Sequence, residues 1–164
     1  MAPATATLPS PATLDRLLAF VTAIGLGVRE TTLATDGFLP GVRIEDGVLL
    51  VDRARLQYPG DVLHEAGHLA VVPAAERPYV QADITAGHPE RAGDELAVHP
   101  WSYAACLALG LPAEVVFHAG GYHGGGQWLA DNYRAGTYIG LPLLAWMGLT
   151  TNEGFPQMTR WTRE

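Results

Sequence analysis

The sequence predicts an α+β fold in which helices pack on a small β-hairpin or sheet. Three features lead to this prediction. Residues 61–72 form an apolar run with an acid at its start and Pro73 at its end, which is typical of a helix. Two short β-prone segments flank Asp46-Gly47, a strong signal for a two-residue hairpin turn. Further apolar stretches at residues 95–109 and 127–146 supply helices that can cover the strands.

Length and composition predict one folded domain. A chain of 164 residues can bury about two-thirds of its unfolded surface in a single core. Residues 1–12 are rich in Pro, Ala and Thr, so we expect a flexible leader there and the domain over residues 13–164. The single cysteine, Cys106, excludes an intrachain disulfide and a zinc site built from cysteines.

Charge and hydropathy exclude several kinds of partner. The net charge is −7 and lysine is absent, which argues against a nucleic-acid surface because such a surface needs a basic patch. The apolar run at residues 17–28 is too short to span a bilayer and lacks a preceding basic region. We therefore expect no membrane association and a cytoplasmic location.

The remaining elements follow from caps, turns and breakers along the chain. Thr13 can cap a first helix that runs to about Gly25, and residues 41–45 and 48–51 are the hairpin strands. Residues 73–93 contain three prolines and two glycines, which predict a long loop. The helix after Gly93 should reach Leu109, but Pro100 implies either a kink after His99 or a helix that starts at the proline.

Two C-terminal segments complete the predicted domain. Residues 118–126 are rich in glycine and predict a flexible flap with Tyr122 and His123 at its tip. They match neither a Walker loop nor a G-x-G-x-x-G fingerprint, so we expect no phosphate site. Residues 127–146 predict one or two closing helices around Gly140.

The segment His64-Glu65-Ala66-Gly67-His68 is an H-E-x-x-H motif inside the helix predicted at residues 61–72. Residues four apart share one face of a helix, so His64 and His68 can bind one metal ion. Glu65 projects about 100° away, where it can reach a metal-bound water without binding the metal. A histidine on an apolar helix is often an ordinary core residue, but this buried trio without a metal would carry a heavy desolvation cost. The motif therefore predicts a metal site.

A zinc hydrolase needs a third protein ligand and an open position for water. The metzincin extension requires Gly at position 71 and His at position 74, but the chain has Val71 and Ala74. The other common solution is a glutamate from a later helix, and Glu95 is the best candidate. Further candidates, in falling order of preference, are Asp94 and His99, then His88 and Glu90.

The hairpin, the H-E-x-x-H helix and the downstream glutamate together resemble the gluzincin group of zinc metallopeptidases, especially its small single-domain forms. The resemblance covers residues 42–109, and Pro100 departs from the continuous helix of that group. It implies a zincin-like core in which His64, His68 and Glu95 bind one Zn²⁺ per chain and Glu65 is the general base. It also implies a zinc-dependent metallopeptidase or amide hydrolase that acts on a peptide or protein substrate.

Two questions stay open at the level of sequence. A tetrahedral oxyanion needs a further donor, and we favour Tyr122 or His123 as catalytic residues beside Glu65, with Tyr103, His99 and His118 as alternatives. The alternative function is a non-catalytic metal-binding or partner-binding module with a structural zinc site. Glu65 favours catalysis, because a structural site needs no general base. The apolar C-terminal third allows a homodimer.

Overall fold

The structure, a computed structural model, describes residues 10–35 and 37–164. Over these residues the chain has a mixed α+β fold with five α-helices and one three-stranded sheet. The helices are α1 (Pro11–Ala23), α2 (Gly60–Ala70), α3 (Asp94–Ala108), α4 (Gly126–Arg134) and α5 (Leu141–Trp146). The strands are β1 (Gly27–Glu30), β2 (Val42–Glu45) and β3 (Val48–Val51). The α+β class expected from the sequence is confirmed.

The first helix begins earlier than the sequence predicts. Ser10 is the N-cap of α1, and its side chain accepts a hydrogen bond from the backbone N–H of Thr13. Pro11 fits the first helical position because its missing N–H would have no helical partner there. The last two residues assigned to the leader, 11 and 12, are thus helical, and residues 1–9 lie outside the described part of the chain.

The sheet has the strand order β1-β3-β2. The predicted hairpin is confirmed: β2 and β3 pair antiparallel, and Asp46 and Gly47 have the positive φ angles of a tight hairpin turn. The sequence did not predict β1, which pairs parallel with β3. Three of its four residues are exposed, so it lacks the alternating apolar pattern that reveals a half-buried strand.

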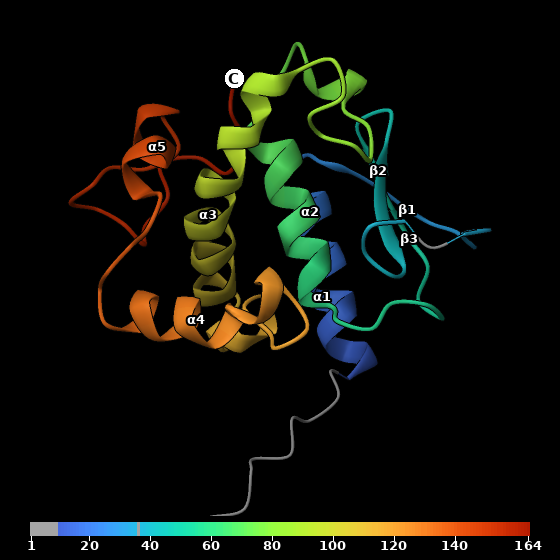
Figure 1. Cartoon of the computed structure of the whole chain (residues 1–164), viewed down its shortest axis with the longest axis horizontal. Helices are drawn as coiled ribbons and strands as arrows, with labels where there is room; N and C mark the ends of the chain where they lie inside the picture. Colours follow the sequence, from blue (N-terminus) through green and yellow to red (C-terminus); the bar gives the residue numbers. More distant parts are fainter. Residues whose placement is uncertain (1–9, 36) are drawn as a thin grey trace, which may run out of the picture.

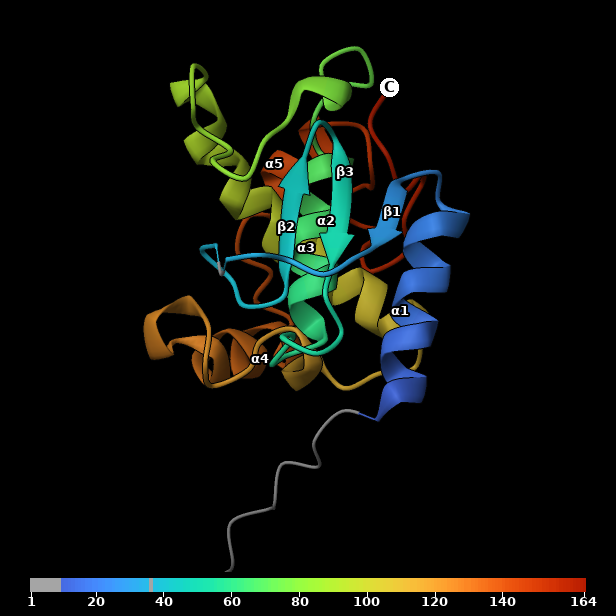
Figure 2. The same cartoon turned by 90° about the vertical axis from the view of Figure 1, so that its right-hand side faces the viewer.

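Helix α2 lies at the centre of the fold, between the sheet on one side and α3 on the other (Figures 1 and 2). Nine of its eleven residues are buried, and only His64 and Glu65 are partly exposed. A helix that is apolar on nearly all sides needs cover on nearly all sides. The two half-open residues are therefore the point where α2 meets the surface.

Helix α3 is continuous from Asp94 to Ala108 with Pro100 inside it, which excludes one of the two alternatives that the sequence left open, a helix that starts at the proline. Proline has no N–H, which leaves the carbonyl of Leu96 without its helical partner. The backbone of Gly140 packs directly against this carbonyl, where any Cβ would overlap the Leu96 oxygen. The turn of α3 that contains the free Leu96 carbonyl thus packs closely against the N-terminus of α5.

The remaining segments agree in outline with the sequence. The predicted loop after Pro73 contains two 3₁₀ turns, η1 (Arg77–Tyr79) and η2 (Pro89–Gly93). Two more, η3 (Ala113–Val115) and η4 (Tyr122–Gly124), precede α4. The prediction of closing helices around Gly140 is confirmed by α4 and α5. Among the helices of the described residues, none is long and apolar enough to cross a membrane.

Candidate metal centre

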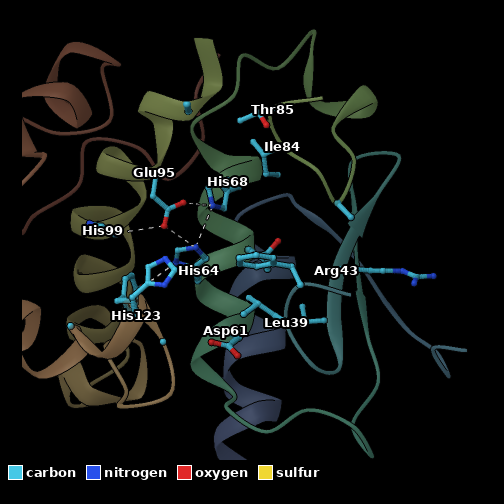
Figure 3. Close-up of a pocket in the computed structure, with 18 of the residues that line it drawn as sticks. Leu39, Arg43, Asp61, His64, His68, Ile84, Thr85, Glu95, His99 and His123 are labelled. Atoms are coloured by element: carbon cyan, nitrogen blue, oxygen red, sulfur yellow. Dashed lines mark hydrogen bonds and ion pairs between the residues drawn. The ribbon is translucent and has the colours of Figure 1, made fainter. Parts of the chain in front are cut away.

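Helices α2 and α3 bring three potential metal ligands together. His64 and His68 stand one turn apart on α2, and Glu95 lies in the first turn of α3 (Figure 3). The two imidazole Nε2 atoms are 3.3 Å apart. Glu95 places Oε1 3.2 Å from Nε2 of His64 and Oε2 2.9 Å from Nε2 of His68. These three side chains form a compact group that can hold a metal ion.

The spacing of the donor atoms fits a small tetrahedral cation. Zinc binds nitrogen and oxygen ligands at about 2.0–2.2 Å, so two ligands of a tetrahedral site lie roughly 3.3–3.5 Å apart. The separations of 2.9, 3.2 and 3.3 Å observed here approach that value. Two imidazoles and one carboxylate are also a ligand set found in catalytic zinc sites. The residues therefore fit the metal that the motif predicts.

Glu95 is held in the ionised form that a metal ligand needs. Burial acts to raise the pKa of its carboxyl group, but hydrogen bonding to His64, His68 and His99 outweighs burial and holds the pKa well below its usual range. His99 lies one helical turn after Glu95 on α3, and its Nε2 is 3.5 Å from Oε1 of Glu95. His99 thus borders the group of three ligands without belonging to it.

Tyr122 holds the first histidine in place. Its hydroxyl oxygen is 3.0 Å from Nδ1 of His64, on the side of the ring opposite the group of three ligands. An Nδ1–H that donates to this oxygen leaves the Nε2 lone pair free for a metal. Burial raises the pKa of Tyr122 well above its ordinary value, so the phenol stays neutral. Its ring also packs edge-on against His99 and Phe117.

The backbone that presents Tyr122 is strained. Tyr122 and His123 have φ angles of 56° and 52°, a region that residues with side chains seldom occupy. Such conformations persist when the surroundings enforce them, and they cluster at functional sites. The structure thus places Tyr122 among packed rings in the wall of the pocket, whereas the sequence predicted it at the tip of a flap.

A buried hydrogen bond fastens the segment that precedes this turn. Nε2 of His118 lies 2.7 Å from Oδ1 of Asp61 in the first turn of α2, and both residues are buried. The ring of Tyr58 stacks on His118 with 3.8 Å between the ring centroids. Gly120 passes so close to Tyr58 that a Cβ would lie 2.6 Å from the phenol ring. His118 is therefore engaged in tying the glycine-rich segment to α2.

Glu65 lines a pocket of about 620 Å³, together with the three ligands. No hydrogen bond to its carboxylate exists within residues 10–35 and 37–164, and burial raises its pKa to about 7. The carboxylates of Glu95 and Asp61 add to this rise, whereas His64 opposes it. A carboxylate with a pKa near neutrality can both accept and return a proton, as a general base must.

The other predicted site residues take different positions. His123 is exposed and lines the pocket, but it makes no recorded contact with the three ligands. Tyr103 packs among Tyr133, Tyr138 and Phe155 and does not line the pocket. Of the other candidate ligands, Asp94 is half-buried outside the group, and His88 pairs with Glu90 at 3.0 Å in the neighbourhood of η2.

The contacts that support the ligands could not be predicted from the sequence. In the sequence Asp61 is only the acid at the start of a predicted helix and Tyr58 has no predicted role, yet both contact His118 in the segment that presents Tyr122. Nothing in the local pattern around Tyr58 and Asp61 indicates His118 as their partner, because 57 residues separate His118 from Asp61. Only the folded chain brings them together.

Comparisons with protein-family models, with curated proteins and with solved structures found no match. The resemblance to gluzincins therefore depends on the residues of this chain alone.

Proposed function

We propose that the chain is a zinc-dependent peptidase or amide hydrolase with a gluzincin-like site. The observation that carries the proposal is the grouping of His64, His68 and Glu95 at the edge of a pocket that Glu65 also lines. A site of three protein ligands beside an open pocket suits a catalytic metal, since a structural zinc site closes its fourth position with protein.

The order of elements supports a zincin-like core for this proposal. A β-hairpin (β2 and β3) leads into the helix with H-E-x-x-H (α2), and the next α-helix (α3) carries the glutamate. The resemblance to the small gluzincins implies this same order of elements for residues 42–109. Helix α3 runs through Pro100 without a break, which removes the departure that the proline implied in the sequence.

Zinc bound by His64, His68 and Glu95 would supply a Lewis acid that polarises a substrate carbonyl and lowers the pKa of water toward ~7. Glu65 takes the proton of the attacking water and returns it to the leaving amine. Tyr122 keeps the ring of His64 oriented through Nδ1. Of the two favoured donors to the oxyanion, His123 is the better placed. It lines the pocket, whereas the hydroxyl of Tyr122 already forms a hydrogen bond with His64.

A peptide substrate is supported by the neighbouring strand. β2 is an edge strand of the sheet, and Val42 and Arg43 on it line the pocket. An extended peptide can add to such an edge through backbone hydrogen bonds. The side chain of Arg43 points away from the three ligands (Figure 3) and Val42 is buried in the core, so the strand offers mainly its backbone to a substrate.

The test compares wild-type protein with the Glu65→Gln variant on a peptide library. We expect both to contain the same amount of metal and the variant to lose about 10²–10⁴ of the turnover, since a general base contributes about this factor. Glu153→Gln, an exposed position outside the pocket, is the matched control and should leave turnover unchanged. Hydrolysis at the wild-type rate by Glu65→Gln would exclude the assigned base. A wild-type protein with a full metal site and no activity on the library would favour the structural alternative.

A further inference from the structure

Two arginines from different parts of the chain, Arg77 and Arg163, donate hydrogen bonds to the backbone at the end of α2. The final carbonyls of a helix have no partner within the helix. Arg77 donates from Nε to the carbonyl of Leu69 at 2.8 Å and from Nη2 to that of Val72 at 3.2 Å. His68, the second histidine of the site, immediately precedes Leu69 in this last turn.

The C-terminal segment forms hydrogen bonds with the carbonyls of Ala70 and Val71, which lie between those of Leu69 and Val72. The backbone N–H of Arg163 donates to the carbonyl of Ala70 at 2.8 Å, and its Nη1 donates to that of Val71 at 3.3 Å. Arg77 also donates from Nη2 to the carbonyl of Arg163 at 2.7 Å, which links the two arginines. All four carbonyls of residues 69–72 thus have partners.

The same C-terminal segment also contacts α3, the helix that provides Glu95. The indole N–H of Trp101 on α3 donates to the carbonyl of Trp161 at 2.9 Å. The Trp161 ring packs edge-on against Trp101, with 5.8 Å between centroids, and against Phe20 of α1. Residues 161–163 therefore touch both helices that contribute ligands. The C-terminus lies at the end of the molecule where α2 ends and α3 begins (Figure 1).

The charges of the two arginines suit this position. Two guanidinium groups next to the C-terminus of α2 face the negative end of its dipole. Burial lowers the pKa of Arg77, which shows that the guanidinium is partly removed from water. A partly buried cation needs hydrogen-bond acceptors, and the three carbonyls around Arg77 provide them.

We propose that Arg77 and residues 161–163 are positioning elements of the metal site. They hold the last turn of α2 against α3, and this sets the position of His68 relative to Glu95, whose facing atoms are 2.9 Å apart. The role in metal binding rests on the proposed function, whereas the fastening of the two helices stands on the hydrogen bonds alone.

The first test measures zinc affinity and the visible absorption spectrum of the Co²⁺-substituted full chain in the Arg77→Gln and Arg163→Ala variants. Both are measured at a temperature where circular dichroism shows folded protein. We expect Arg77→Gln to weaken zinc binding about 10–100-fold, the effect typical of residues that orient ligands, and to alter the Co²⁺ spectrum. Arg163→Ala should have a smaller effect, because its backbone N–H still bonds to Ala70. Arg160→Ala is the control, since the side chain of Arg160 pairs, within the described part of the chain, with the exposed Glu164 alone. Unchanged affinity and spectrum in the folded Arg77→Gln variant would overturn the proposal.

A second measurement separates this inference from the proposed function. Amide hydrogen exchange of residues 66–72 in metal-free protein reports the fastening without zinc. We expect faster exchange there in Arg77→Gln and not in Arg160→Ala, and equal exchange would overturn the fastening. A wild-type protein that binds neither zinc nor Co²⁺ would overturn the proposed function and the metal part of this inference, while exchange would still decide the fastening.

Discussion

At the scale of single residues, the two nitrogens of each ligand histidine have different surroundings. Nδ1 of His64 meets the hydroxyl of Tyr122 and its Nε2 faces Glu95. Nδ1 of His68 is buried and has no hydrogen-bond partner among the described residues, while its Nε2 also faces Glu95. Both rings therefore present the same type of atom to the metal position, but only His64 is oriented by a neighbouring side chain.

Removal of the Tyr122 hydroxyl should weaken metal binding. In Tyr122→Phe we expect zinc affinity to fall about 10–100-fold, because the ring of His64 loses the group that orients it. Affinity can be measured by competition with a chromophoric chelator. Tyr79→Phe, which changes a phenol that is 74% exposed, should have no effect. Unchanged affinity together with a lower kcat would instead assign Tyr122 to the substrate.

Glu65 should make the metal-free protein less stable as the pH rises. Its pKa is about 7 in the folded chain and near 4.5 in an unfolded one, so between these values the folded state binds more protons than the unfolded state. The free energy of unfolding therefore falls with rising pH, by at most about 1.4 kcal/mol per pH unit from this group. Glu65→Gln lacks this dependence.

Urea unfolding in the presence of a chelator, at several pH values from 4.5 to 7, checks this prediction. As the pH rises across this range, the free energy of unfolding of Glu65→Gln should increase relative to that of the wild type. The reason is that only the wild-type chain must release a proton from the carboxyl group of Glu65 when it unfolds. A constant difference between the two proteins would contradict the shifted pKa.

At the scale of elements, the grouping of His64, His68 and Glu95 depends on how closely α2 approaches α3. Gly67, between the two histidines, faces α3. A Cβ at this position would lie 2.8 Å from Cγ1 of Val98 and 3.2 Å from the Trp101 ring. Both neighbours are fully buried, so neither can move freely. The glycine of the motif thus permits a helix contact that brings Glu95 to the histidines.

The Gly67→Ala variant should push the two helices apart. We expect about 1–3 kcal/mol of destabilisation from overpacking, despite the better helix propensity of alanine, together with weaker zinc binding. Thermal unfolding and zinc titration measure the two effects. Gly93→Ala is the matched control, because a Cβ there meets no atom within 4 Å. Equal behaviour of the two variants would show that the approach of α3 does not set the site.

Local patterns explain which elements could be predicted from the sequence. The Asp46-Gly47 turn, the run that ends at Pro73 and the H-E-x-x-H spacing each depend on neighbouring residues, and the hairpin and α2 follow from them. Strand β1 could not be predicted, because its pairing with β3 reaches across the chain from Gly27 to Val48. Likewise Glu95 was one candidate among several until the packing of α3 placed it beside His68.

At the scale of the whole molecule, the fold is arranged around one mostly buried helix with an opening over its two partly exposed residues, His64 and Glu65. The sheet and α3 cover the sides of α2, the C-terminal segment bonds its end, and the segment from His118 to Tyr122 is tied to its start. Among the described residues of α2, His64 and Glu65 alone stay partly exposed, and both line the pocket. This architecture leaves one face of α2 open to the pocket and buries the rest of the helix.

Elemental analysis of the untagged protein, beside the His64→Ala variant, tests the central claim most directly. We predict about one zinc per wild-type chain and none in His64→Ala, because the variant loses one of only three protein ligands. Circular dichroism should show that the variant still folds, since His64 is only partly buried. Wild-type protein that contains no metal, even after zinc is added, would contradict the account.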